Sequence, residues 1–203
     1  MDDPVPAAAP EAEGRGMSRV FLSSPALRPP GAVKEKEFVV RCIRCGQCVE
    51  ICPHGTLVFK GGFGRDRHTP MFEPEDTPCY LCMKCPPVCP SGALDASLTD
   101  MRRAHMGRAH ILRNRCHNYT GATMCMTCYD RCPLRASAII LADGLTPAVT
   151  SACTGCGICA HVCPVKAVVV LSREAHWVPG DAVPTLPAEG ETMPPHHATG
   201  DAR

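Results

Sequence analysis

The sequence is poor in the large side chains from which most domains build a core. Of its 203 residues only nine are aromatic, five Phe, three Tyr and one Trp. Long hydrophobic runs are also missing, because the longest apolar stretches (138–142 and 167–171) fall far short of the roughly 18 to 20 residues of a membrane-spanning helix. We therefore expect no transmembrane span of its own, and we expect something other than apolar packing to hold the chain together.

The sequence also lacks an excess of charge and the usual signatures of an enzyme. Lys and Arg number 21 against 20 Asp and Glu, for a formal net charge of +1. This balance gives no reason to expect a nucleic-acid partner. We find no Gly-rich phosphate loop, no flavin or nicotinamide fingerprint and no supported Ser/His/Asp constellation. We therefore predict no catalytic residues and no enzyme activity for this chain by itself.

Both ends of the chain lack cysteine. All 16 cysteines lie between residues 42 and 163, whereas the flanks are rich in proline and alanine. We expect residues 1–33 to form an extended or disordered N-terminal tail and residues 174–203 a disordered C-terminal tail. An ordered wrap over the core is the alternative for the stretch 27–33.

The central region, residues 34–173, contains a fourfold cysteine repeat, with units at 42–53, 79–90, 116–133 and 153–164. Three units follow the compact pattern C-x2-C-x2-C-x3-C-P, and in the third unit eight residues separate the first two cysteines. Repeats of this kind usually reuse one structural unit. The cysteines are Cys42, Cys45, Cys48 and Cys52; Cys79, Cys82, Cys85 and Cys89; Cys116, Cys125, Cys128 and Cys132; and Cys153, Cys156, Cys159 and Cys163.

The compact pattern is the ligand run of bacterial ferredoxins for a [4Fe–4S] cluster. Two residues between ligands let a tight loop wrap three corners of a cubane, and the fourth cysteine usually ligates the other cluster of a pair. Gly46, Gly155 and Gly157 suit the positive φ that such loops need. We predict four [4Fe–4S] clusters with all sixteen cysteines as metal ligands. Three other uses of cysteine fit this spacing poorly. Secreted disulfide scaffolds and structural zinc sites do not repeat the compact pattern. Haem c attachment needs a C-x-x-C followed by histidine, and the sequence contains none.

The wide gap in the third unit leaves two interpretations. Cys116 is either a ligand that precedes a looped-out insertion, which we prefer because the count then closes at sixteen, or no ligand at all. In the second case one iron would be open to substrate.

Short apolar runs flank the units and predict the fold class. The runs at 38–40, 56–59, 111–112, 138–141, 147–150 and 168–171 favour strands, and one helical turn fits after each Cys-Pro. We predict an α+β fold of two ferredoxin-like dicluster modules with short strands and helices, flanked by the Pro/Ala-rich tails. Adjacent pairing joins the first unit with the second and the third with the fourth. Nested pairing would instead bring 38–40 beside 168–171, and both remain open.

Two groups of side chains lack a settled role. The stretch 102–115 carries five arginines, two histidines and no acid, which indicates either a docking patch for an electron-transfer partner or a solvated helix face that offsets cluster charge. His54 and His161 lie close to ligand cysteines, so either could tune a cluster by hydrogen bonding, although a surface role is the simpler interpretation.

The ordered motifs resemble the NapG/MauM ferredoxin-type family over about residues 26–173. The resemblance rests on the lead-in Ala26-Leu-Arg-Pro-Pro-Gly-Ala32, the first unit, Cys89-Pro-Ser-Gly-Ala-Leu94, Met106-Gly107, the widened third unit and Ala152-Cys-Thr-Gly-Cys-Gly157. It implies an electron-transfer subunit in which all sixteen cysteines are ligands. It also implies a membrane quinol-oxidising ferredoxin-type partner (NapH-like) and a terminal redox enzyme or cytochrome, such as a periplasmic nitrate reductase or an amine dehydrogenase system.

The same resemblance implies the periplasmic face of the inner membrane. Family members usually carry a twin-arginine export signal, but Met17-Ser-Arg-Val-Phe-Leu22 lacks the second arginine and no apolar region follows it. A cytoplasmic location is therefore the alternative. The alternative functions are an iron–sulfur subunit of a cytoplasmic oxidoreductase complex, and a zinc-stapled interaction module without redox chemistry.

Overall fold

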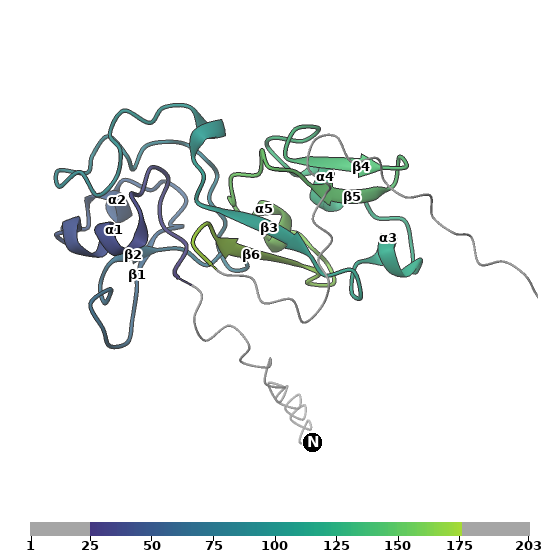
Figure 1. Ribbon diagram of the computed structural model, residues 1–203, viewed down its shortest axis with the longest axis horizontal. Coiled ribbons are helices and arrows are strands. Elements are labelled where there is room, and N and C mark those ends of the chain that lie inside the picture. The colour runs from purple at the N-terminus through teal and green to yellow at the C-terminus, as the bar shows by residue number, and fades with distance from the viewer. Residues whose placement is uncertain (1–24, 176–203) are drawn as a thin grey trace, which may run out of the picture.

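The computed structural model describes residues 25–175 as two halves joined side by side (Figure 1). The first half contains α1 (Glu35–Arg41), α2 (Gln47–Glu50), β1 (Val58–Phe59), β2 (Pro70–Met71) and the 3₁₀ turn η1 (Met101–Arg103). The second half contains β3 (Gly107–Ile111), α3 (His117–Thr120), α4 (Thr127–Asp130), β4 (Ile139–Ala142), β5 (Thr146–Val149), α5 (Ile158–His161) and β6 (Val168–Ser172). This mixture of short helices and strands agrees with the predicted α+β class.

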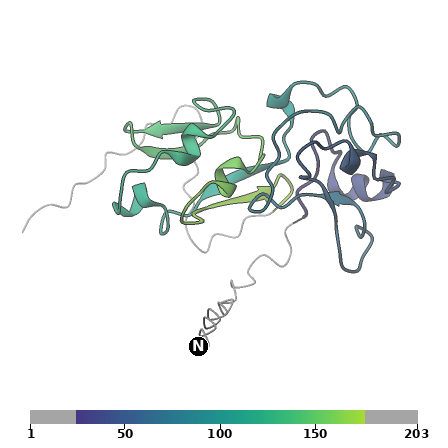
Figure 2. The same cartoon turned by 180° about the vertical axis from the view of Figure 1, so that it is seen from behind.

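Three two-stranded antiparallel sheets organise the halves. β1 pairs with β2 and β4 pairs with β5, each as a local hairpin. β3 and β6 pair across the sequence, from Gly107 opposite Ser172 to Ile111 opposite Val168. β3 precedes the third cysteine unit and β6 follows the fourth, so this sheet closes the second half around both units (Figure 2).

The predicted strand at 38–40 is wrong, because these residues lie in α1. Glu35 and Glu37 occupy the first turn of α1 and Arg41 the last, an arrangement that favours a helix electrostatically. Of the three residues 38–40, only Phe38 is fully buried, with a side chain that is 0% exposed. Val40 faces solvent. Nested contact of 38–40 with 168–171 is therefore absent from the described residues, since β6 pairs with β3.

The other strand predictions are confirmed with shifted ends. β1, β4, β5 and β6 fall within or across the predicted runs, and β3 ends where the run at 111–112 begins. In the first, third and fourth units, however, the helical turn lies before the Cys-Pro and not after it, whereas the second unit has only turns at that place. α2, α4 and α5 span the residues between the third and fourth cysteines of their units, because the chain must rise one turn between those two side chains.

Residues 25–33 are not part of a loose tail but form a strap over the first half. Leu27 and Arg28 are buried, and the Leu27 carbonyl accepts a hydrogen bond from the N–H of Phe72 at 3.1 Å. The N–H of Val33 donates to the Ala93 carbonyl at 3.0 Å. The ordered wrap is thus the correct alternative for this stretch. Residues 1–24 and 176–203, where we expected the tails, lie outside the described residues.

Two buried clusters of side chains form the core, and cysteines belong to both. Phe38 and Phe72 pack with Cys79, Cys85 and Cys156 in the first cluster, and Cys128 and Cys159 pack with Ile139 and Val168 in the second. Within residues 25–175, no helix is long and apolar enough to cross a membrane. Five of the sixteen cysteines are therefore part of the interior together with the apolar side chains.

Candidate metal centres

Each compact cysteine unit wraps its loop by two left-handed residues. The residues on either side of the second cysteine have positive φ in all three units: Arg44 and Gly46, Leu81 and Met83, and Gly155 and Gly157. The predicted role of the glycines is thus confirmed for Gly46, Gly155 and Gly157. In the second unit Leu81 and Met83 hold the same conformation with side chains that rarely adopt it, which concentrates backbone strain at this loop.

The sixteen cysteines fall into four quartets, each made of three cysteines of one unit and the fourth cysteine of its neighbour. Cys52 lines one pocket together with Cys79, Cys82 and Cys85. Cys132 lines another pocket with Cys153, Cys156 and Cys159. The unit that donates the fourth cysteine is the adjacent one in both cases.

The remaining two quartets follow from the electrostatics of the thiols. Burial, and then repulsion from Cys42, Cys45 and Cys89, raises the pKa of Cys48 to about 11. Burial, and then Cys116, Cys125 and Cys163, likewise raises the pKa of Cys128 to about 11. We name the quartets first (42, 45, 48, 89), second (52, 79, 82, 85), third (116, 125, 128, 163) and fourth (132, 153, 156, 159). Adjacent pairing of the units is therefore the one that the structure adopts.

The quartets suit a group that needs thiolate ligands in a shielded place. Burial raises the pKa of Cys79 to about 12 and that of Cys159 well above its usual value, so these thiols need a positive partner to ionise. Cys52 differs: burial raises its pKa, but hydrogen bonds from the backbone N–H groups of His54, Thr56 and Leu57 outweigh it and lower the pKa overall. Amides that stabilise a thiolate also stabilise a metal-bound sulfur.

Further backbone N–H groups point at sulfur atoms in both halves. Those of Leu94, Ala109 and Ala167 donate to the Sγ atoms of Cys89, Cys153 and Cys163 at 3.4, 3.5 and 3.2 Å. Across residues 25–175, no three His, Cys, Asp or Glu side chains are arranged to hold a single metal ion. The second and fourth cysteine quartets instead surround a shared space, as the four corners of a cubane require.

The insertion in the third unit is an ordered structure. α3 follows Cys116 directly, and the side chain of Asn118 bonds to both backbone groups of Cys125. The hydroxyl group of Tyr119 also donates to the Pro147 carbonyl at 3.1 Å, which ties α3 to β5. Cys116 consequently lies beside Cys128 despite the wide gap, as the preferred interpretation requires.

Comparison with known proteins identifies the family. Residues 41–93 match the 4Fe-4S dicluster domain, and residues 148–169 match the 4Fe-4S binding domain. The methylamine utilization ferredoxin-type protein MauM of Paracoccus denitrificans is 41% identical over 163 residues, 73% of this chain and 72% of that protein. The ferredoxin-type protein NapG of Escherichia coli is 40% identical over 155 residues, 69% of this chain and 67% of that protein. The chain belongs to the NapG/MauM family of ferredoxin-type proteins.

Membership of the NapG/MauM family fixes the broad function. The chain is a ferredoxin-type electron-transfer protein that binds 4Fe–4S clusters, and it is an electron-transfer subunit and not an enzyme. MauM of Methylobacillus flagellatus, 42% identical over 171 residues (77% of this chain and 73% of that protein), agrees with this assignment.

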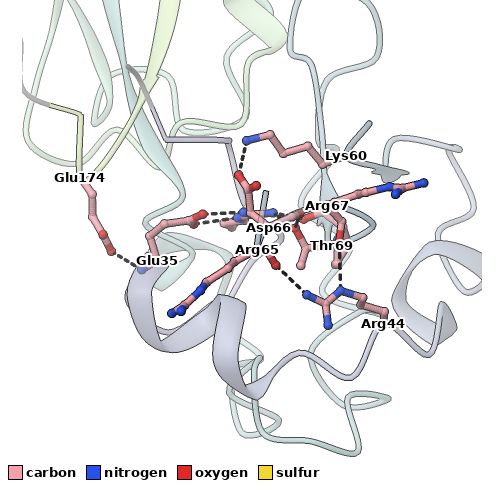
Figure 3. A network of polar contacts seen from close by, with 10 residues as sticks. Glu35, Arg44, Lys60, Arg65, Asp66, Arg67, Thr69 and Glu174 are labelled. Atoms are coloured by element: carbon pink, nitrogen blue, oxygen red, sulfur yellow. Dashed lines mark hydrogen bonds and ion pairs between the residues drawn. The ribbon is translucent and has the colours of Figure 1, made fainter. Parts of the chain in front are cut away.

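One contact at the first unit appears only in the folded structure. Arg44, between Cys42 and Cys45, donates from Nε to the Arg67 carbonyl at 2.9 Å and from Nη2 to the Arg65 carbonyl at 2.6 Å (Figure 3). These bonds tie the loop between β1 and β2 to the first NapG/MauM-type unit. No local signal in the sequence reveals a contact more than twenty residues away.

The basic stretch at 102–115 is not a helix face. It runs through η1 and β3, and its five arginines are exposed. Arg108 donates to the Val149 carbonyl at 3.2 Å, and the guanidinium of Arg113 lies over the Tyr119 ring at 4.8 Å. The alternative, a docking patch for a redox partner, stays a prediction.

His54 and His161 use their rings for contacts other than cysteine sulfur. The His54 ring packs against Tyr80 with centroids 4.4 Å apart, and only its backbone N–H bonds to Cys52. His161 Nδ1 lies 3.0 Å from the Glu75 carbonyl. The surface role suggested for both residues therefore describes their side chains better than cluster tuning does.

Proposed function

We propose that the chain relays single electrons through four [4Fe–4S] clusters, one in each cysteine quartet. The observation that carries the proposal is that all sixteen cysteines fall into four complete quartets, with none left over. Each quartet combines three cysteines of one unit with the fourth cysteine of the adjacent unit, which is the ligand scheme of dicluster ferredoxins.

The assignment makes every cysteine a ligand. Cys42, Cys45, Cys48 and Cys89 hold the first cluster; Cys52, Cys79, Cys82 and Cys85 the second; Cys116, Cys125, Cys128 and Cys163 the third; and Cys132, Cys153, Cys156 and Cys159 the fourth. The four-cluster region then runs from the strap at 25–33 through residue 173, because Pro30 of the strap lines the cavity of the second quartet.

A bound cluster supplies one-electron redox chemistry, and the chain's residues set the conditions for it. The buried thiols of Cys85 and Cys159 keep water from one side of the second and fourth sites. The amides of Leu94, Ala109 and Ala167 lie against ligand sulfurs and favour the more negative, reduced state. In each electron transfer the donor loses one electron and the acceptor gains one, and the chain transfers no proton.

We further propose a quinol-oxidising membrane protein as the donor and a terminal oxidoreductase as the acceptor, at the periplasmic face of the inner membrane. The names of the MauM relatives place them in methylamine utilization, which supports an amine dehydrogenase system as one acceptor. The similarity to NapG is almost as high, and the family resemblance implies a periplasmic nitrate reductase as another acceptor.

Analysis of the intact, anaerobically purified protein tests the cofactor part of the proposal. We expect about sixteen iron and sixteen acid-labile sulfide per chain, and reduction by four electrons with S = 1/2 paramagnetic resonance signals. The matched variants are Cys156→Ser, which should lose iron and stability together, and Ser151→Ala, an exposed neighbour that should lose neither. A colourless protein that binds zinc would overturn the proposal.

Fractionation of the native host with capture of this chain tests the pathway part. We expect recovery on the periplasmic side with a polytopic quinol-oxidising partner. Recovery from the cytosol in complex with a soluble catalytic subunit would overturn the pathway and leave the clusters in place.

A further inference from the structure

The two halves of the molecule meet at the second and fourth cysteine units. The backbone N–H of Cys79 donates to the carbonyl oxygen of Cys156 at 2.8 Å, a bond between two quartets in different halves. Cys156 also belongs to the buried core of the first half, together with Cys79 and Cys85. The second and fourth quartets are thus joined directly through the backbone of their own cysteines.

Two neighbouring contacts extend this seam. Gly157 approaches Pro74 so closely that a Cβ atom on the glycine would lie 2.2 Å from the Pro74 Cβ. Four residues after Gly157, His161 Nδ1 lies 3.0 Å from the carbonyl oxygen of Glu75, the residue that follows Pro74. Pro74 and Glu75 immediately precede the second unit, whereas Gly157 and His161 belong to the fourth. The seam therefore involves the second and fourth units over several residues.

The other two quartets lie away from the seam. The first quartet is built on α1 and α2, which form one end of the molecule, and the third on α3 and α4, towards the opposite end (Figures 1 and 2). α5 of the fourth quartet packs on α4 of the third, and Cys159 lies close to Cys128. The third quartet therefore contacts the rest of the series through the fourth.

We infer that the four metal centres are arranged in the spatial order first, second, fourth, third, which differs from their order along the chain. The inference rests on the proposed four clusters. It makes the first and third quartets the two ends of the series, so the donor and the acceptor dock at these ends.

Magnetic coupling between reduced clusters tests this order, because only neighbouring paramagnetic centres broaden one another's resonance signals. In Cys159→Ala, which removes the fourth cluster, we expect one narrow, non-interacting spin per chain, since the third cluster has lost its only neighbour. In Cys125→Ala, which removes the third cluster, we expect no such spin. A series in chain order gives the reverse: no isolated spin in Cys159→Ala and one in Cys125→Ala.

Cys45→Ala is the matched control, because the first cluster is terminal in both orders and its loss leaves the other three coupled. Iron analysis must show a loss of about four iron per chain in each variant. The reversed pattern in fully loaded variants overturns the order and leaves the proposed relay intact. An unaltered protein without iron overturns the proposed function, and the order with it.

A second measurement uses the unaltered, loaded protein in case the variants fail to fold. Anomalous scattering at the iron absorption edge from crystals locates the four centres directly. We expect the centre of the second quartet to lie nearer to that of the fourth than to that of the third. A second centre nearer to the third overturns the inference.

Discussion

The side-chain amide of Asn118 holds the backbone of Cys125 from both sides. Its Oδ1 accepts a hydrogen bond from the Cys125 N–H at 2.7 Å, and its Nδ2 donates to the Cys125 carbonyl at 2.8 Å. Nδ2 donates in addition to the Leu145 carbonyl in the β4–β5 turn. This contact closes the insertion of the third unit and fixes a cysteine that the wide gap would otherwise leave free.

Loss of this contact should weaken the third site selectively. In Asn118→Ala we expect the free energy of unfolding to fall by about 2 kcal/mol, since two partly buried hydrogen bonds and one exposed hydrogen bond disappear. We also expect the iron content to fall towards twelve per chain. Asn118→Asp, which can still accept from the Cys125 N–H, should give an intermediate result. Asn114→Ala, at an exposed asparagine nearby, is the control. Full iron content in Asn118→Ala would show that the clamp does not position Cys125.

Two glycines with the same φ allow the energetic cost of left-handed backbone strain to be measured apart from the cost of close packing. Gly155 and Gly144 both have φ of 74°. A Cβ atom on Gly155 would lie 2.4 Å from the Gly107 carbonyl carbon, whereas one on Gly144 would meet nothing within 4 Å. We expect Gly144→Ala to cost about 1 kcal/mol from φ alone. Gly155→Ala should cost at least about 2 kcal/mol more, because backbone must move.

Chemical denaturation of the loaded proteins checks this pair, with iron content measured alongside. Gly155 precedes Cys156, so Gly155→Ala should also lower iron binding at the fourth quartet. Equal losses of stability in the two variants would mean that the fourth loop and β3 have room to separate.

Ala136 carries strain that glycine would remove. It has φ of 65° and is exposed in the turn after the third unit. We expect Ala136→Gly to raise the free energy of unfolding by up to about 1 kcal/mol, because the relief of left-handed strain exceeds the entropy that glycine adds to the unfolded chain. The control is Ala122→Gly, an exposed alanine without positive φ, which should be neutral or destabilising. Denaturation midpoints compare the two, and a loss in Ala136→Gly contradicts the assigned turn.

The strap should contribute to stability through Arg28. Its Nε donates to Glu35 Oε2 at 2.7 Å and its Nη1 to the Thr69 hydroxyl oxygen at 2.8 Å, and its guanidinium lies over the Phe38 ring at 4.8 Å. In Arg28→Met we expect a loss of about 3 kcal/mol or more, because the carboxylate of Glu35 is left without its partner.

A double-mutant cycle with Glu35→Gln measures this pair by equilibrium unfolding. The double variant should be more stable than Arg28→Met alone, because the unpaired charge is gone. Strictly additive losses would show that the ion pair contributes nothing. The exposed pair of Glu37 and Arg41 is the control, and its loss should change stability by less than about 1 kcal/mol.

The sequence by itself determined what lies within one cysteine loop. The spacing within each unit sets the reach between neighbouring thiols, and Gly46, Gly155 and Gly157 have the positive φ that was predicted. The hairpin strands β4 and β5 were also predictable, because their partners lie a few residues away. Such features depend on neighbours along the chain, and the residue types there suffice to indicate them.

Only the tertiary structure decided which distant segments meet. The spacing of a unit leaves its fourth cysteine free to reach any neighbouring loop, so the pairing of Cys52 with the second unit depended on how the loops pack. The helix at 35–41 and the burial of the strap arose from the need to cover Phe38 and Leu27. The bond from Cys79 to Cys156 joins backbone groups, which every residue carries, and no residue type in the sequence marks such a contact.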